Sequence, residues 1–259
     1  MKKLIAPIIC LIFLGSAFAA SAQKKREFYA IQVYYLQDAA QDQRVDNYLQ
    51  QAYLPALHRM GMSKIGVFKP HGNDTSSNKR IFVLMPLKSL EQLVKVQEKL
   101  QKDKAYQQAS ESYNAAAHNA PNYRRMETIV LQAFTGMPVS DKPALKSEVA
   151  KRVYELRSYE GATERLYANK VDMFNRGDEI GLFRRLGFNA VFYGEVLAGS
   201  RMPNLMYMTS FENMDERNAH WKAFGADAQW KELSAKAEYK NNVSKSDTWL
   251  LQATPYSDL

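Results

Sequence analysis

Short apolar and aromatic runs, separated by polar stretches, predict eight strands in this chain. Two of these strands, residues 191–196 and 205–211, flank a polar loop and precede Asn213, a residue typical of a helix N-cap. Glu216 stands three residues further on and completes a capping box. This stretch therefore predicts strand, loop, strand and helix. The other predicted strands are residues 28–36, 65–68, 81–85, 128–134, 153–161 and 248–254.

Apolar residues at helical spacing fill the intervals between the strands. Ser89 and Gln92 predict a second capping box at the start of such a helix. Pro55 predicts a kink or a break in the helix between the first two strands. The predicted buried positions are Val45, Tyr48, Leu49, Ala52, Leu57 and Met60, then Leu90, Leu93, Val94 and Leu100, and in one helix of the second half Leu166, Val171, Phe174, Phe183 and Leu186.

The order of these segments occurs twice along the chain. Residues 58–69 (HRMGMSKIGVFK) match residues 184–195 (RRLGFNAVFYGE), and residues 80–90 (RIFVLMPLKSL) match residues 204–214 (NLMYMTSFENM). Three further pairs match in the same order, 28–36 with 153–161, 103–106 with 227–230, and 131–133 with 251–253. An ordered set of matches predicts two copies of one structural unit.

Each predicted unit has the order β-α-β-β-α-β, which is that of the ferredoxin-like split motif. We therefore predict an α+β fold built from tandem ferredoxin-like repeats. Helices would cover one face of each sheet, and the two uncovered faces of two four-stranded antiparallel sheets would meet inside one chain. The two units would then close face to face as an internal pseudo-dimer, a barrel-like α+β assembly. The predicted divisions are a signal peptide at 1–22, a divergent first repeat at 23–134, a linker at 135–151 and a second repeat at 152–259.

The first residues have the pattern of a secretory signal peptide. Lys2 and Lys3 precede an apolar run at residues 4–19, and the Ala-Ser-Ala at 20–22 fits a cleavage site, so the mature chain would begin near Gln23. A membrane anchor is the alternative, but the run is shorter than the roughly 20 apolar residues of a bilayer span. We expect an exported protein, periplasmic or extracellular, that has no membrane attachment after cleavage.

Cleavage would also change the composition. Cys10, the single cysteine, lies in the apolar run, so the mature chain would contain neither a disulfide nor a thiolate. Loss of Lys2 and Lys3 lowers the formal net charge from +8 to +6, which is 8 − 2. The remaining positive charge is spread along the chain without a basic block, which argues against a nucleic-acid partner. Assembly into a homo-oligomer stays open.

The second half resembles a NIPSNAP domain. The resemblance lies in residues 154–159 (YELRSY), the Leu-Gly-Phe turn at 186–188, residues 192–195 (FYGE), and the segment from 211–212 through 216–217 to Trp230. The first half is less similar, because Ala30 and Gln32 stand where the family has Glu and Arg. The resemblance implies an intrachain dimeric α/β-barrel, of a superfamily that includes cofactor-independent monooxygenases, haem-handling enzymes and proteins of unknown activity.

Familiar catalytic motifs are absent from the sequence. It contains no Gly-x-Ser-x-Gly elbow, no phosphate-binding Gly-rich loop and no His-Glu-x-x-His helix. The histidines are scattered: His71 and His118 fit solvated loops, and His58 falls near a helix end, where a cation suits the helix dipole. We therefore expect neither a metal nor a cofactor.

Comparison of the two halves indicates where a site would lie. On the first strand of each half, Glu155 replaces Ala30 and Arg157 replaces Gln32, and these side chains share one strand face. On the capped helix, Arg217 replaces Leu93 and His220 replaces Val96, three residues apart on one helical face. The second half thus carries charged or titratable groups where the first half carries small, neutral or apolar ones.

Three interpretations of these groups are open, because unpaired charges are costly to bury. They are internal pairing, such as Glu155 with Arg157 or Arg217; a polar pocket for a small anion or carbonyl compound; and catalysis with His220 or Glu155 as base. Aromatic residues, including Trp221 and Trp230, gather in the same half and suit either core packing or a ligand pocket. The candidate ligand-binding residues are Glu155, Arg157, Tyr159, Tyr193, Glu195, Tyr207, Arg217 and His220; no catalytic residue is assigned.

The sheet face that Glu155 and Arg157 occupy decides which candidates can meet. Tyr154 and Leu156 suit the helix-covered face, so we predict that Glu155 and Arg157 point into the barrel interior. The function that fits best is an exported NIPSNAP-domain module that binds a small ligand or an interaction partner. The alternative, by analogy of fold, is a cofactor-independent monooxygenase or isomerase acting on an aromatic or carbonyl substrate. Haem binding through a histidine is a third hypothesis.

Overall fold

The computed structural model describes residues 25–73 and 75–259, so the predicted signal peptide and its cleavage site lie outside the described residues. All eight predicted strands are present. They are β1 Phe28–Tyr35, β2 Gly66–Pro70, β3 Arg80–Leu87, β4 Arg125–Ala133, β5 Val153–Glu160, β6 Asn189–Ala198, β7 Asn204–Phe211 and β8 Lys245–Ala253. Within these described ranges, no helix has the length and apolar character needed to cross a membrane.

Helices connect the strands within each half. In the first half they are α1 Ala39–Tyr48, the π-helix η1 Leu49–Tyr53, α2 Leu54–Arg59, α3 Leu90–Leu100, α4 Lys104–Ala109 and α5 Glu111–Asn114. In the second they are α6 Glu164–Asn175, α7 Glu179–Arg185, α8 Met214–Ala226 and α9 Ala228–Ala235. Two short 3-10 helices, η2 Val149–Lys151 and η3 Ala237–Tyr239, precede β5 and β8 respectively.

Both predicted capping boxes form. The amide of Gln92 donates to the Ser89 hydroxyl at 3.3 Å, and the amide of Glu216 donates to the Asn213 side chain at 2.9 Å. The returning side chains bind the residue before each cap: Lys88 N donates to Gln92 at 2.8 Å, and Glu212 N donates to Glu216 at 2.7 Å. These contacts satisfy free amides at the starts of α3 and α8.

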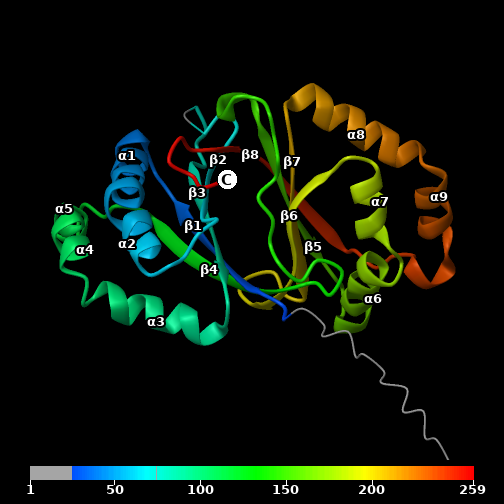
Figure 1. Cartoon of the computed structure of the whole chain (residues 1–259), viewed down its shortest axis with the longest axis horizontal. Coiled ribbons are helices and arrows are strands. Elements are labelled where there is room, and N and C mark those ends of the chain that lie inside the picture. Colours follow the sequence, from blue (N-terminus) through cyan, green and yellow to red (C-terminus); the bar gives the residue numbers. More distant parts are fainter. Residues whose placement is uncertain (1–24, 74) are drawn as a thin grey trace, which may run out of the picture.

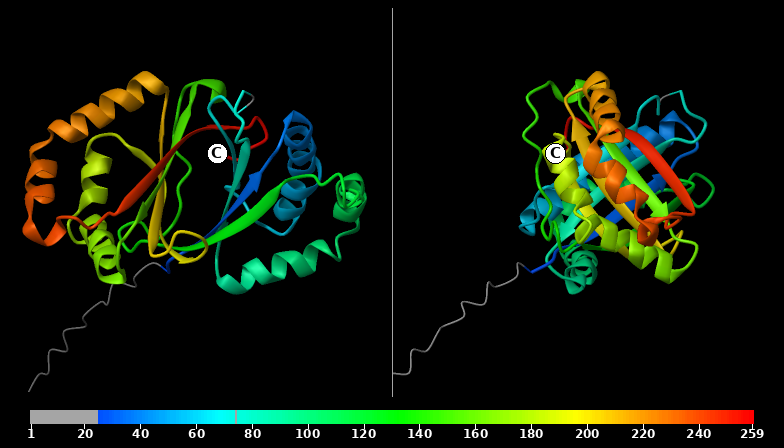
Figure 2. Two further views of the ribbon diagram at one scale, coloured as in Figure 1. Left: turned by 180° about the vertical axis from the view of Figure 1, so that it is seen from behind. Right: turned by 90° about the vertical axis from the view of Figure 1, so that its right-hand side faces the viewer.

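The strands form one closed barrel in the order β1-β3-β2-β8-β5-β7-β6-β4, and all of these pairings are antiparallel. Each half contributes four neighbouring strands, β4-β1-β3-β2 and β8-β5-β7-β6, and its helices lie outside them (Figures 1 and 2). The two four-stranded sheets that were predicted to face each other inside one chain are therefore joined edge to edge into a single closed barrel. The edge strands of one half pair with those of the other, β2 with β8 and β4 with β6, which satisfies their free backbone groups.

The three largest apolar cores among the described residues follow from this arrangement. The barrel interior combines side chains of both halves, among them Tyr29, Phe68, Tyr154, Leu156, Phe192 and Met208. Outside the barrel, a core with Val45, Leu57 and Val83 lies under the helices of the first half. A third core, rich in aromatic residues such as Phe174, Phe183 and Tyr207, lies under the helices of the second half. Each half-sheet is thus buried on both faces.

The helices differ from the local predictions at three places. Leu90 and Val94 are 45% and 63% exposed, because α3 packs through Val96 together with Leu100, which was one of the predicted positions. Pro55, predicted to cause a kink or a break, does not end the helical segment, since it stands in the first turn of α2, directly after the wider π-helical turns. The single helix expected after β5 is two helices, α6 and α7, and Asp178 at a positive φ of 60° begins the second one.

Candidate functional site

Strand β5 turns Glu155, Arg157 and Tyr159 towards the helices, whereas Tyr154 and Leu156 belong to the barrel core. The predicted orientation of Glu155 and Arg157 was therefore wrong. The reason is that the interior is apolar where both half-sheets contribute to it, whereas α8 supplies partners for charged groups on the other face. This orientation brings the strand pair and the helix residue Arg217 together.

The carboxylate of Glu155 is completely buried and accepts four hydrogen bonds. Arg157 Nε donates to Oε1 at 2.6 Å, and Arg217 donates from Nε to Oε2 at 2.7 Å and from Nη2 to Oε1 at 3.0 Å. Trp221 Nε1 donates to Oε2 at 2.8 Å. Burial opposes ionisation, but the bonds from Arg217 and the charge of Arg157 outweigh it and lower the pKa of Glu155.

The Arg157 guanidinium links this carboxylate to a pair of phenols. Its Nη1 donates to the Tyr159 hydroxyl at 3.0 Å, and the hydroxyls of Tyr159 and Tyr207 are 2.9 Å apart. The guanidinium carbon lies 3.9 Å from the centre of a Trp221 ring, a cation–π contact. Among the described residues, Nη2 of Arg157 has no hydrogen-bond partner. Burial raises the pKa of Tyr207 well above its ordinary value, so its hydroxyl stays protonated.

A second buried ion pair lies close by and was missed in the sequence. Lys170 Nζ and Glu179 Oε2 are 2.7 Å apart, and their side chains are 6% and 4% exposed. The ammonium also lies 4.6 Å from the ring centre of Phe174 and 5.8 Å from that of Trp230. The sequence did indicate that Lys170 is buried, because it stands four residues before Phe174 and therefore on the predicted apolar stripe.

These groups border a cavity of about 380 Å³ between the second half-sheet and its helices. Arg157, Tyr159, Lys170 and Glu179 provide its polar wall, and the aromatic wall consists of Phe183, Trp221, Phe224 and Trp230. Aromatic side chains beside a few convergent charged groups are typical of a small-molecule site. We call this space the arginine cavity.

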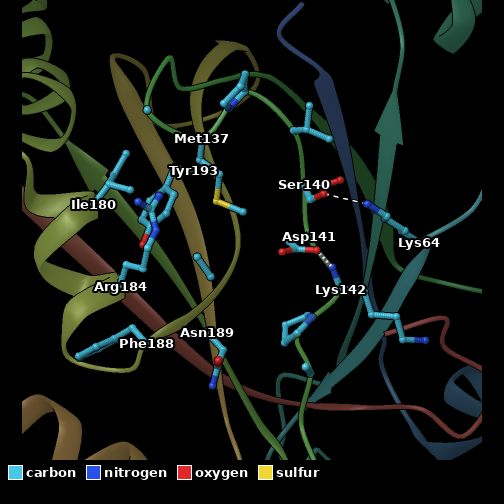
Figure 3. A pocket seen from close by; sticks show the side chains of 16 residues that line it. Lys64, Met137, Ser140, Asp141, Lys142, Ile180, Arg184, Phe188, Asn189 and Tyr193 are labelled. Atoms are coloured by element: carbon cyan, nitrogen blue, oxygen red, sulfur yellow. Dashed lines mark hydrogen bonds between the residues drawn. The ribbon is translucent and has the colours of Figure 1, made fainter. Parts of the chain in front are cut away.

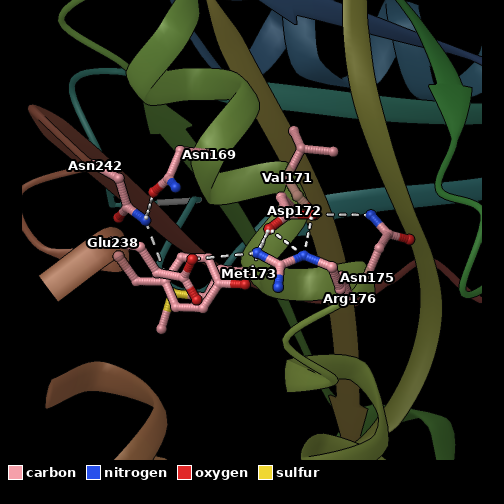
Figure 4. A network of polar contacts seen from close by, with 9 residues as sticks. Asn169, Val171, Asp172, Met173, Asn175, Arg176, Glu238 and Asn242 are labelled. Carbon is pink, nitrogen blue, oxygen red and sulfur yellow. Dashed lines mark hydrogen bonds and ion pairs between the residues drawn. The ribbon is translucent and has the colours of Figure 1, made fainter. Parts of the chain in front are cut away.

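Polar contacts fix the wall of the arginine cavity that α6 and the segment before β8 form (Figure 4). Asn242 Nδ2 donates to Asn169 Oδ1 at 2.9 Å, and Arg176 binds Asp172 at 2.7 Å. The hydroxyl of Tyr239, which also borders the cavity, donates to Asp172 at 2.9 Å. These contacts tie α6 to η3.

The remaining candidates lie elsewhere. Glu195 pairs with Arg26 at 2.6 Å and accepts from the Tyr167 hydroxyl at 3.4 Å. His220 packs against Phe188 and Phe211, and its Nε2 is 3.7 Å from Glu216. Tyr193 stacks on Tyr207 with ring centres 5.5 Å apart, but it borders a different cavity. The site therefore unites Glu155, Arg157, Tyr159, Tyr207 and Arg217 and excludes the other three candidates.

Neither the arginine cavity nor the cavity that Tyr193 borders has a histidine in its wall. Within residues 25–73 and 75–259, no three His, Cys, Asp or Glu side chains are grouped as a metal site would require.

Comparison with known proteins first defines the class by fold. A protein from Fusobacterium nucleatum subsp. nucleatum, provisionally named a monooxygenase, has a similar structure: TM-score 0.58, 5% identity, covering 89% of this chain and 93% of that one. A provisionally named monooxygenase from Lactobacillus acidophilus has a TM-score of 0.57 and 11% identity, and the match covers 88% of this chain and 94% of that one. An anthrone oxidase-like protein has a TM-score of 0.55 and 8% identity, and the match covers 90% of this chain and 93% of that one. At these identities the likeness establishes the fold alone, that of the dimeric α/β-barrel proteins.

Within this class, the NIPSNAP family model matches residues 154–258, so the NIPSNAP resemblance of the second half is confirmed. The matched segment runs from β5 to the residues after β8 and contains every polar group of the arginine cavity. No curated protein matches the chain in sequence.

Proposed function

We propose that the arginine cavity binds a small, flat organic molecule that carries an anionic or carbonyl oxygen. The observation that carries this proposal is the unpartnered Nη2 of Arg157 at the cavity wall. Glu155 and Tyr159 hold the rest of the guanidinium, so this edge is oriented before a ligand arrives. A guanidinium nitrogen held in this way donates a charge-assisted hydrogen bond to a carboxylate, enolate or similar group at low entropic cost.

The shape of the ligand follows from the aromatic wall. The ring of Phe224 contacts those of Trp221 and Trp230, with centres 5.5 Å and 4.4 Å apart. Flat apolar faces of this kind favour an aromatic or otherwise planar skeleton. The polar edge at Arg157 and the aromatic wall together favour a planar acid or an acidic carbonyl compound over an aliphatic cation.

Native mass spectrometry of the purified protein tests the proposal. We expect wild-type protein to retain a small molecule that Arg157→Leu loses, with a stability cost of about 1–3 kcal/mol for removing a partnered buried ion. Arg59→Leu is the matched control, because Arg59 pairs with Asp103 on the first half and is 44% exposed. Equal retention by wild type and Arg157→Leu would remove the guanidinium from the site.

Catalysis is the second candidate function, a cofactor-independent oxygenation of an aromatic substrate. The supporting observation is the hydroxyl pair of Tyr159 and Tyr207 beside Arg157, which could stabilise a substrate enolate. Anthrone is a suitable test substrate, since anthrone and O₂ give anthraquinone and water. Oxygen uptake with stoichiometric anthraquinone, lost in Tyr159→Phe, would support an enzyme. Binding of anthrone without turnover would leave a binding module.

We propose further that the two halves are copies of one unit, and that the chain is exported. The support for duplication is the common strand order of the halves, together with the capping boxes at equivalent helices. The support for export is the pattern of residues 1–22. N-terminal sequencing of protein from its native host should give a chain that begins at Gln23, and a membrane-held chain that begins at Met1 would refute export.

A further inference from the structure

A second cavity, of about 690 Å³, lies between the segment that joins the two halves and the α7–β6 unit (Figure 3). One wall carries Arg184 and Tyr193, and the opposite wall carries Asp141 and Lys142 (Figure 3). The apolar lining includes Met137, Ile180 and Phe188. We call this space the linker cavity.

Two groups on the α7–β6 wall lack partners. Among the described residues, Arg184 makes no side-chain hydrogen bond or ion pair, and neither does the hydroxyl of Tyr193, a residue only 1% exposed. The neighbouring Arg185, by contrast, pairs with Asp227 at 2.9 Å. Burial and then the charge of Glu179 raise the pKa of Tyr193, and the charge of Arg184 opposes them. Arg184 and Tyr193 both line the linker cavity. A cation and a phenol donor therefore face the cavity together.

In the first half, the groove that corresponds to the linker cavity is filled by the chain itself. Residues 254–259 run along β2, where Thr254 N donates to Val67 O at 2.9 Å and Asp258 N donates to Ile65 O at 3.0 Å. His58, the second-last residue of α2, then binds the Asp258 carboxylate at 3.1 Å. A carboxylate from the chain itself therefore lies beside the last turn of this helix.

The linker runs along β6 in the same way, but it leaves the groove open. Phe134 N donates to Tyr193 O at 2.9 Å and Asp141 N donates to Val191 O at 3.0 Å, at the positions that correspond to Val67 and Ile65. Six residues, 135–140, separate these two anchors, whereas three, 255–257, separate those in the first half. The Asp141 carboxylate accepts a hydrogen bond from the amide of its neighbour Lys142 at 2.8 Å.

Arg184 is the second-last residue of α7, as His58 is of α2. Its counterpart carboxylate, Asp141, makes no hydrogen bond or ion pair to it in the part of the chain that the structure describes. The linker cavity occupies the gap between them. The position that a carboxylate fills in the first half is therefore open in the second.

We infer that the linker cavity binds a small organic carboxylate with an apolar skeleton, in a site separate from the arginine cavity. The carboxylate takes the place that Asp258 has in the first half and accepts hydrogen bonds from Arg184 and the Tyr193 hydroxyl. The skeleton packs against Met137, Ile180 and Phe188. Arg184, Lys64 and Lys142 give the lining three positive charges against one from Asp141, which favours an anion.

The probe for this site is 2-naphthoate, and its neutral isostere 2-naphthamide is the matched ligand. Calorimetric titration should show one molecule of naphthoate bound at the linker cavity and binding of the amide weaker by about tenfold or more. Arg184→Gln should weaken naphthoate by about tenfold, and Tyr193→Phe by a smaller factor. Arg185→Gln is the control, because it removes a guanidinium from the same helix that is already paired.

Four outcomes would overturn the inference: no saturable binding, equal affinity for the acid and the amide, equal affinity of wild type and Arg184→Gln, or loss of binding in Arg157→Leu alone. The last result would assign the probe to the arginine cavity. Arg184 is exposed and unpaired, so Arg184→Gln should unfold at the same urea concentration as wild type, and a difference in affinity then reports on the site.

Discussion

Glu155 is the residue on which the candidate site depends. Its carboxylate is fully buried, and its four hydrogen bonds hold two arginines and Trp221 in fixed positions. A carboxylate with a lowered pKa and this many donors is a poor general base. The interpretation of Glu155 as a base is therefore less consistent with the geometry than a positioning role, in which it orients Arg157 towards the cavity.

Glu155→Gln should destabilise the protein by about 2–4 kcal/mol, because the amide keeps the shape but leaves two partly buried guanidinium groups without their counter-ion. Urea unfolding measures this difference. Glu195→Gln is the control, since Glu195 is also paired with an arginine but its side chain is 29% exposed. Equal losses of unfolding free energy in the two variants would mean that the burial of Glu155 does not make its ion pairs more important for stability than the partly exposed pair of Glu195.

The same carboxylate predicts how stability depends on pH. Its pKa is lowered from an ordinary value of 4.5, so the unfolded chain binds more protons than the folded chain in acid. The stability difference between wild type and Glu155→Gln should be complete at pH 7 and should shrink as the pH falls from about 4.5 through the folded pKa. A difference that stays constant from pH 7 to pH 3 would contradict the ion-pair cluster.

At the scale of elements, local signals in the sequence were sufficient for the strands and for both capped helices. They were not sufficient where the position of a side chain depends on packing against a neighbouring element. Strand alternation groups Glu155 with Arg157, but the choice of face is made by α8 and by the apolar interior shared with the other half. Lys170 and Glu179 were missed because each becomes buried only through the other. Leu90 and Val94 were assigned to the buried stripe with Leu100, but α3 leaves them exposed and packs through Val96 and Leu100.

The cap of α8 gives a prediction at this scale. Asn213→Ala should lower stability by about 1 kcal/mol, because it removes the acceptor of the Glu216 amide. It should also weaken ligand binding in the arginine cavity, since α8 carries Arg217 and Trp221. Ser89→Ala removes the equivalent cap of α3 and should cost similar stability without any effect on binding. Urea unfolding and the retained ligand in native mass spectra give both readouts.

At the scale of the whole molecule, the barrel depends on two junctions between the halves. β2 pairs with β8 through Phe68–Pro70 and Leu251–Ala253, and β4 pairs with β6 through Val130–Ala133 and Gly194–Ala198. Each half alone would expose two strand edges and one apolar sheet face. The second half can keep the arginine cavity by itself, because all of the cavity's lining residues lie between Arg157 and Ser246.

We therefore predict that a fragment comprising residues 152–259 forms a dimer. The edges of β6 and β8 and the face with Tyr154 and Leu156 are covered by the first half in the intact chain, and a second copy of the fragment can cover them in the same way. Sedimentation equilibrium should give twice the fragment mass, with a dissociation that follows protein concentration. Removing the inward side chain with Leu156→Asp should abolish the dimer, whereas Leu197→Asp, at a side chain already 43% exposed, should leave it intact. A stably folded monomer of the fragment would show that the barrel interior is not what holds the halves together.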